Sequence, residues 1–92
     1  MEITKTANAG SLESNDVLVF VHANQEPGVS IEIKSIVLDQ FGDQIRDCVK
    51  EMADQLGVTR GVFQVNDRGA LDYTIRARVE TAVLRAAGEE NA

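Results

Sequence analysis

The sequence predicts a small α+β domain in which a sheet of about three strands packs against two helices, with a mobile arm at the N-terminus. Three observations support this fold. The 92 residues suffice for one domain with a single small core. Apolar and β-forming residues dominate two short stretches in the first half of the chain. Farther along, apolar residues recur every three or four positions, as on one face of a helix. The expected element order is β-β-α-β-α.

Residues 1–16 form the least core-like part of the chain. Small and polar residues there show no sustained apolar period. We therefore expect a flexible arm over residues 1–16 and a single α+β domain over residues 17–92.

Two strands are expected directly after the arm. Residues 17–23 are rich in β-formers and apolar on both faces, which favours a strand covered on two sides. Residues 29–34 alternate apolar and polar positions, as in a half-buried strand. Pro27-Gly28 between them is a strong turn signal. We expect the two strands to form an antiparallel hairpin.

The best-supported element is a helix in the segment that follows Ser35. Its apolar positions share one helical face: Leu38, Phe41, Ile45, Cys48, Val49, Met52 and Leu56. Ser35 is a plausible N-cap, and Gly57 is placed to close the C-terminus.

A third strand and a second helix complete the expected fold. Residues 61–66 have the composition of a strand, and Asp67-Arg68-Gly69 follows as a turn. Asp72 is a candidate cap for a helix that ends at Gly88. The opening of this helix also alternates as a strand would, but its Ala-rich second half favours a helix.

The net charge of −6 and the pI of about 4.6 argue against nucleic acid as a partner, because phosphate binding needs a clustered basic surface. The charge suits basic protein surfaces, although solubility alone also explains it and is the favoured interpretation. One cysteine allows no internal disulfide, and no secretory signal is visible. The longest apolar run, Val17 to Val21, is too short to cross a bilayer. We expect a cytoplasmic protein without membrane contact.

The residues offer little for catalysis or metal binding. His22 is the only histidine, and it shares a strand face with Leu18 and Phe20, which favours a partly buried structural role. Cys48 falls on the apolar helix stripe, where a cysteine behaves as a small hydrophobe. One His and one Cys cannot supply the usual nitrogen and sulfur ligands of a metal. No Gly-rich phosphate loop follows a strand. We expect neither a catalytic nor a metal site.

A protein without its own reactive groups can still take part in catalysis if it carries a prosthetic group on which other enzymes act. Such a carrier needs an attachment nucleophile in an exposed segment. Ser14, among small residues at the end of the arm, is the candidate, because the modifying enzyme can supply the base that a serine needs.

Four segments carry a resemblance to a known family: Ala9–Val17, Gln40–Arg46, Gly69–Asp72 and Ile75–Glu80. Each segment is short, but their order and spacing resemble the acyl carrier protein, or gamma subunit, of citrate lyase from Ala9 to about Gly88. The resemblance implies a non-catalytic carrier.

The resemblance further implies that Ser14 bears 2'-(5''-phosphoribosyl)-3'-dephospho-CoA through a phosphodiester. The thiol of this arm would carry acetyl and citryl thioesters. The alpha (transferase) subunit would exchange acetyl for citrate and release acetate. The beta (lyase) subunit would release oxaloacetate and restore the acetyl thioester. A holo-carrier synthase would attach the arm.

The neighbours of Ser14 raise further expectations. Ser11 is a rival attachment residue in the same segment. Asn15 stands where the family commonly has glycine or another small residue, which bears on the shape of the loop. Glu13 and Asp16 place negative charge on either side, to orient a basic partner or simply to keep the arm solvated. Elsewhere in the chain, Arg76, Arg78 and Arg85 are mostly interleaved with acids and alanines, which favours a solvent-exposed helix face over a docking patch.

Two other functions remain open. The carrier subunit of malonate decarboxylase uses a related group, although its attachment segment is usually Gly-Ser-Gly-Asp-like. A small acidic adaptor without covalent cargo is the second alternative. The usual phosphopantetheine carrier is disfavoured, because no Asp-Ser-Leu occurs and strands follow Ser14 directly.

Overall fold

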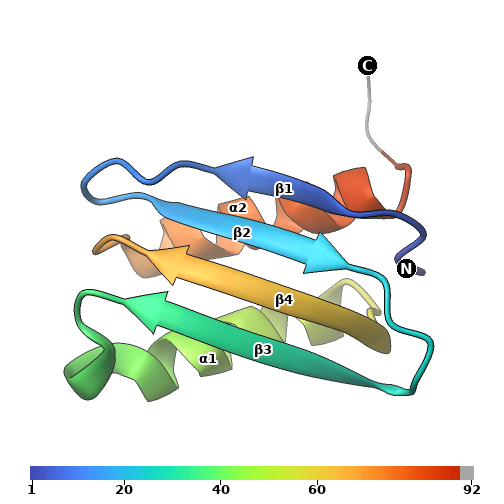
Figure 1. Ribbon diagram of the computed structural model, residues 1–92, viewed down its shortest axis with the longest axis horizontal. Helices are drawn as coiled ribbons and strands as arrows, with labels where there is room; N and C mark the ends of the chain where they lie inside the picture. The colour runs from blue at the N-terminus through green and yellow to red at the C-terminus, as the bar shows by residue number, and fades with distance from the viewer. Residues whose placement is uncertain (90–92) are drawn as a thin grey trace.

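The computed structural model describes residues 1–89, which form a four-stranded sheet with two helices on one face (Figure 1). The elements are β1 (Ala7–Gly10), β2 (Val17–His22), β3 (Gly28–Ser35), α1 (Leu38–Gln55), β4 (Arg60–Asp67) and α2 (Asp72–Ala86). The α+β class and both helices are confirmed. The expected count of about three strands is corrected to four within the described residues, and the order is β-β-β-α-β-α.

The strands lie in the order β1-β2-β4-β3. β2 pairs antiparallel with both β1 and β4, whereas β3 runs parallel to β4. The expected hairpin of β2 and β3 is therefore wrong, because β4 lies between them. The chain after β2 passes the end of β4, where the Gly28 N–H donates to the Thr59 carbonyl at 2.8 Å. α1 then carries the chain back, as a parallel pair requires.

β1 lies in the segment expected to form an arm. Ala7 and Ala9 of this strand face Val21 and Val19 of β2 in the register of the sheet. Ile3 is buried, and the N-terminal amine donates to the carbonyls of residues 56 and 57 at 3.1 and 2.8 Å. Because the inward side chains of β1 are small, the strand has no hydrophobic period strong enough to reveal it. The flexibility expected of residues 1–16 stays a prediction.

The core is mostly aliphatic and lies between the sheet and the helices. Phe63 of β4 is its only fully buried aromatic side chain within residues 1–89. Around it pack the buried apolar residues of β2 and β4 and of the inner helix faces: Val17, Val19, Val21, Val65, Ile45, Val49, Met52, Ile75, Val79 and Val83. The two-residue and 3.6-residue periods of the sequence correspond to these inward faces.

The ends of the helices partly differ from expectation. α1 begins after Val37, and Ser35 instead ends β3, where its hydroxyl donates to Asp67 at 2.8 Å. Asp72 is the first residue of α2 and makes no side-chain capping bond. Gly57 does close α1, with a φ of +69° and a Val58 N–H that donates to a carbonyl one turn back.

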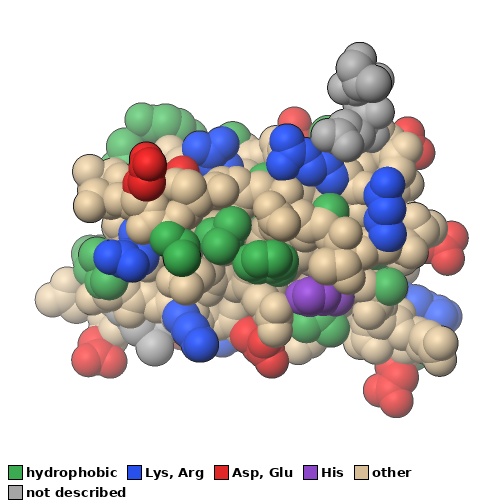
Figure 2. All heavy atoms as spheres, turned by 45° about the horizontal axis from the view of Figure 1, so that its top comes forward, with side chains coloured by type: hydrophobic (Ala, Val, Ile, Leu, Met, Phe, Trp, Pro, Cys, Tyr) green, Lys and Arg blue, Asp and Glu red, His purple; other side chains and the backbone are tan. Residues whose placement is uncertain are grey.

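The second face of the sheet is uncovered by helices. Figure 2 shows hydrophobic side chains in the middle of this face beside His22, and His22, Phe20 and Leu18 alternate with the buried valines of β2. The His22 ring bonds to the Gln64 side chain at 2.8 Å, and the expected partial burial of His22 is confirmed, whereas its structural role stays a prediction. Within residues 1–89, no helix has the length and apolar character needed to span a bilayer.

Candidate functional site

Ser14 lies at the tip of the loop that joins β1 to β2. The Asp16 N–H donates to the Glu13 carbonyl at 3.1 Å, which closes a tight turn with Ser14 and Asn15 at its centre. Ser14 is exposed, and its hydroxyl has no hydrogen-bond partner among residues 1–89. This oxygen can therefore be reached from outside without first breaking a hydrogen bond within the domain.

Asn15 gives this turn its shape. Its φ of +67° is the only positive φ of a non-glycine residue within the described part of the chain. Glycine and asparagine are the residues that adopt this conformation most readily, so asparagine is compatible with the turn at this position. The Asn15 N–H also donates to the Arg68 carbonyl at 2.8 Å, and the Arg68 N–H donates to the Asp16 carbonyl at 2.9 Å. The loop is thereby joined to the β4–α2 connection.

Gly10 allows the loop to leave β1. Its φ is +93°, and a Cβ at this position would lie 1.8 Å from the Val17 carbonyl oxygen. Only glycine therefore permits β1 and β2 to approach each other this closely beside Ser14.

The Asp16 carboxylate holds the base of the loop. It accepts bonds from the Ser11 hydroxyl and the Val17 N–H, both at 2.7 Å, and from Arg78 of α2 at 3.1 and 3.2 Å. Its side chain is only 16% exposed. The Ser11 hydrogen bond, followed by the bond from Arg78, lowers the pKa of Asp16 to about 2. Asp16 is therefore ionised and anchored to α2 at neutral pH.

The two candidate attachment residues differ in their surroundings. The Ser11 hydroxyl donates to Asp16 and accepts the Glu13 N–H at 3.2 Å, whereas the Ser14 hydroxyl is free. Attachment at Ser11 would replace the donor that makes the largest contribution to the ionisation of Asp16. The geometry therefore favours Ser14.

Arg78 is the residue of this site that sequence reasoning missed. Its expected place on a solvated face is wrong in part, because its guanidinium pairs with Asp16 across 62 positions of the chain. As a consequence, Asp16 does not present free negative charge beside Ser14, and only Glu13 does. Both Asp16 and Arg78 fall within the segments that carried the family resemblance, which was the available signal.

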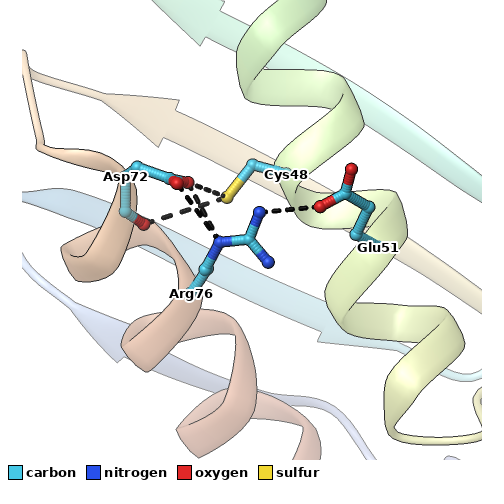
Figure 3. A network of polar contacts seen from close by, with 4 residues as sticks. All are labelled: Cys48, Glu51, Asp72 and Arg76. Carbon is cyan, nitrogen blue, oxygen red and sulfur yellow. Dashed lines mark hydrogen bonds and ion pairs between the residues drawn. The ribbon is translucent and has the colours of Figure 1, made fainter.

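A second polar cluster lies in a groove between α1 and the start of α2. Figure 3 shows Arg76 between two carboxylates: its Nε atom is 3.1 Å from Asp72 and its Nη2 atom is 2.7 Å from Glu51. The Cys48 thiol donates to Asp72 at 2.9 Å. Burial and then the Asp72 hydrogen bond raise the pKa of Cys48 to about 12. Cys48 is therefore a buried, protonated thiol, as expected from its place in the apolar stripe.

Neither cluster provides a metal site. Within residues 1–89, no group of three or more His, Cys, Asp or Glu side chains is arranged to hold a metal ion. The chemistry that the loop offers is that of one accessible alcohol.

Comparisons with known proteins relate this arrangement to carriers. The model of the family described as "Malonate decarboxylase delta subunit (MdcD)" matches residues 4–86. Citrate lyase acyl carrier protein 2 of Salmonella typhimurium is 47% identical over 87 residues, which cover 95% of this chain and 90% of that protein. The citrate lyase acyl carrier protein of Streptococcus mutans serotype c is 47% identical over 90 residues, which cover 98% of this chain and 88% of that protein.

The fold is also similar to a solved structure. A chain in the crystal structure of a Pseudomonas malonate decarboxylase hetero-tetramer in complex with malonate has a TM-score of 0.73, and the match covers 91% of this chain and 86% of that chain. Its sequence identity of 20% limits this likeness to the fold. The citrate lyase carriers match nearly half of all positions over almost the whole chain. The chain therefore belongs to the citrate lyase acyl carrier protein family.

Proposed function

We propose that this chain is the acyl carrier subunit of citrate lyase and that Ser14 is the residue to which its prosthetic arm is attached. The observation that carries this proposal is the free, exposed hydroxyl of Ser14 at the tip of a loop whose base is held by Asp16 and Arg78. The anchored base fixes where the arm leaves the domain, and the open tip gives partners access to it.

The arm proposed for Ser14 is 2'-(5''-phosphoribosyl)-3'-dephospho-CoA. When bound, it would supply a thiol that carries acetyl and citryl groups as thioesters. The residues present fit such a group, because attachment requires one accessible alcohol and Ser14 provides it. On its C-terminal side Ser14 is followed by the small polar residue Asn15, which leaves room for a phosphodiester.

The chain's own part in attachment is to present an alcohol. The Ser14 Oγ–phosphorus bond forms while the bond from phosphorus to the leaving group of the activated arm breaks. The hydroxyl proton passes to a base of the modifying enzyme, because residues 1–89 place no histidine or free carboxylate in hydrogen-bond contact with Ser14. Asp16 is unsuited to this task, since its low pKa and its four hydrogen bonds hold it as a fixed anion.

The partners follow from this role. We propose that a holo-carrier synthase loads the arm, and that the alpha (transferase) and beta (lyase) subunits of citrate lyase act in turn on the acyl group. The net charge of −6 favours encounter with basic partner surfaces and disfavours nucleic acid. We place this carrier in the cytoplasm, together with these enzymes.

Intact mass spectrometry tests the attachment. The chain is coexpressed with the modifying enzymes as wild type, Ser14→Ala and Ser11→Ala, with Ser30→Ala as a control at an exposed serine within β3. We expect the mass gain of one arm in the wild type, Ser11→Ala and Ser30→Ala, and no gain in Ser14→Ala. A normal gain in Ser14→Ala would overturn the assignment.

Carriage for malonate decarboxylase is the second candidate, because the matching family model bears that description. Reconstitution separates the two functions. We expect the loaded chain to restore citrate cleavage when mixed with citrate lyase alpha and beta subunits, and not to restore malonate decarboxylation with the corresponding subunits. A chain purified from its native host without any serine-linked mass would instead favour the adaptor without covalent cargo.

A further inference from the structure

We infer that the groove between α1 and the β4–α2 connection is a resting site for the neutral, amide-bearing thiol end of the arm attached to Ser14. This inference rests on the proposed function, and it assigns to this chain a binding site in addition to the attachment residue. Between visits to its partners, the pantetheine part of the arm would lie against the carrier itself.

The groove has the size and lining of a small-molecule site. Its volume is about 630 Å³, which is within the range of ligand pockets. Its walls are mainly apolar, with Ile45 and Ile75 at the inner side and Phe41, Ala70 and Leu71 farther out. Phe41 and Leu71 are 44% and 59% exposed. Apolar side chains gathered around one hollow indicate that something covers them.

The polar groups of the groove select a neutral ligand. Asp72 and Glu51 already balance the charge of Arg76 (Figure 3). Asp47 adds a further carboxylate to the lining. Phosphates or a citryl group would therefore meet excess negative charge. The Nη1 atom of Arg76 has no hydrogen-bond acceptor among residues 1–89, so it can donate to an amide carbonyl. The pantetheine part of coenzyme A is uncharged and contains two amides, which fits this requirement.

The groove adjoins the attachment loop. Asn15, directly after Ser14, donates its N–H to Arg68, and the next residue, Gly69, lines the groove. A Cβ on Gly69 would lie 3.6 Å from the Asn15 side-chain oxygen. Asp67 holds this connection in place by accepting the Ala70 N–H at 2.9 Å. An arm on Ser14 therefore starts beside one end of the groove.

Tethering makes weak binding sufficient. A group on a short flexible link has an effective concentration in the millimolar range. An arm whose unlinked form binds with a Kd of about 1 mM would thus occupy the groove for roughly half of the time. Such an arm can rest in the groove and still be released readily to a partner with higher affinity.

The first test compares the unloaded and loaded forms of the ¹⁵N-labelled chain by NMR, after intact mass has shown that the arm is attached. We expect the amide signals of residues 69–72 and 76 to shift on loading. Phe20 and Gln64, on the uncovered face of the sheet, serve as controls and should keep their positions.

The second test measures how fast the arm thiol is alkylated in the loaded chain, with mass spectrometry used to separate the arm from Cys48. Leu71→Asp places a charge in the groove, whereas Ile36→Asp adds the same charge at a similarly exposed position that does not line the groove. We expect alkylation to be about twofold faster in Leu71→Asp, as release of a half-occupied arm requires, and unchanged in Ile36→Asp. Circular dichroism checks that both variants are folded.

The outcomes separate this inference from the proposed function. No mass gain at Ser14 would refute the proposed function, and the resting site with it. A normal mass gain with unchanged groove signals and equal alkylation rates would refute the resting site alone. Groove signals that shift only when a citrate lyase subunit is added would mean that the groove binds a partner protein, which would also overturn the inference.

Discussion

The Asp16–Arg78 contact leads to a quantitative prediction about stability. Replacing Asp16 by Asn keeps the shape of the side chain but removes its charge. The pKa of Asp16 is about 2 in the folded protein, compared with 3.8 for an unperturbed group. This difference corresponds to about 2.4 kcal/mol of folding free energy at neutral pH. Because Arg78 is 43% exposed, solvent screens part of the interaction, and we expect a loss of about 1–2 kcal/mol in Asp16→Asn.

The pH dependence has a definite sign. Since the folded pKa of Asp16 is lowered, its contribution is fully present above about pH 4 and is lost as the pH falls through 2. The difference in unfolding free energy between wild type and Asp16→Asn should therefore be constant from pH 7 to pH 5. At pH 3 it should have fallen to roughly half of its value at pH 7.

Urea unfolding followed by far-UV circular dichroism measures both quantities, and urea adds no salt that would screen the ion pair. Asp43→Asn is the matched control, because Asp43 is exposed on α1 and forms no ion pair within the described residues. It should change the unfolding free energy by less than about 0.5 kcal/mol. Equal stability of Asp16→Asn and wild type at pH 7, or a difference that does not change down to pH 3, would refute the role given to Asp16.

Two further predictions concern the backbone beside the loop and the buried thiol. Gly10→Ala should destabilise the domain by more than about 2 kcal/mol, because its new Cβ would meet the Val17 carbonyl. Gly28→Ala, also at positive φ but with no atom within 4 Å of its new Cβ, should cost only about 1 kcal/mol. Similar losses of unfolding free energy for the two variants in urea would contradict the close approach of Gly10 to Val17. Cys48 should resist alkylation at pH 8 in the folded chain and react readily in denaturant, because its pKa is raised to about 12; rapid alkylation of the folded chain would show that the thiol is not buried as described.

Several elements could be predicted from local patterns alone. The apolar stripes of α1 and α2 and the alternation in β3 indicate which side chains face inward. These patterns predicted the two helices and the strand. β1 was missed because its inward residues, Ala7 and Ala9, are too small to stand out from a polar loop. Burial in β1 follows from pairing with β2, which a local window cannot reveal.

Pairing between strands was not predictable in the same way. The β-forming composition of residues 17–23 and the alternation of residues 29–34 indicate two strands but not which strands lie beside them. The Pro27-Gly28 turn suggested neighbours, yet β4 lies between the two strands and pairs with both. The neighbour of a strand is decided by packing among distant segments, and here by the α1 crossover that returns the chain parallel to β3.

The sequence by itself determined the nature of this protein: a small acidic α+β domain without a catalytic set of residues within its length, and a serine in a segment that resembles a known carrier family. Only the tertiary structure decided how Ser14 is presented. Asp16 and Arg78 lie 62 positions apart, and only folding places their side chains within 3.1 Å of each other. Likewise, Ser11 and Ser14 are chemically the same residue in one short segment. Only the structure shows that the Ser11 hydroxyl is hydrogen-bonded and that the Ser14 hydroxyl is free within the described residues. Chemical type is a local property of the chain, whereas accessibility and charge balance arise from contacts between distant residues.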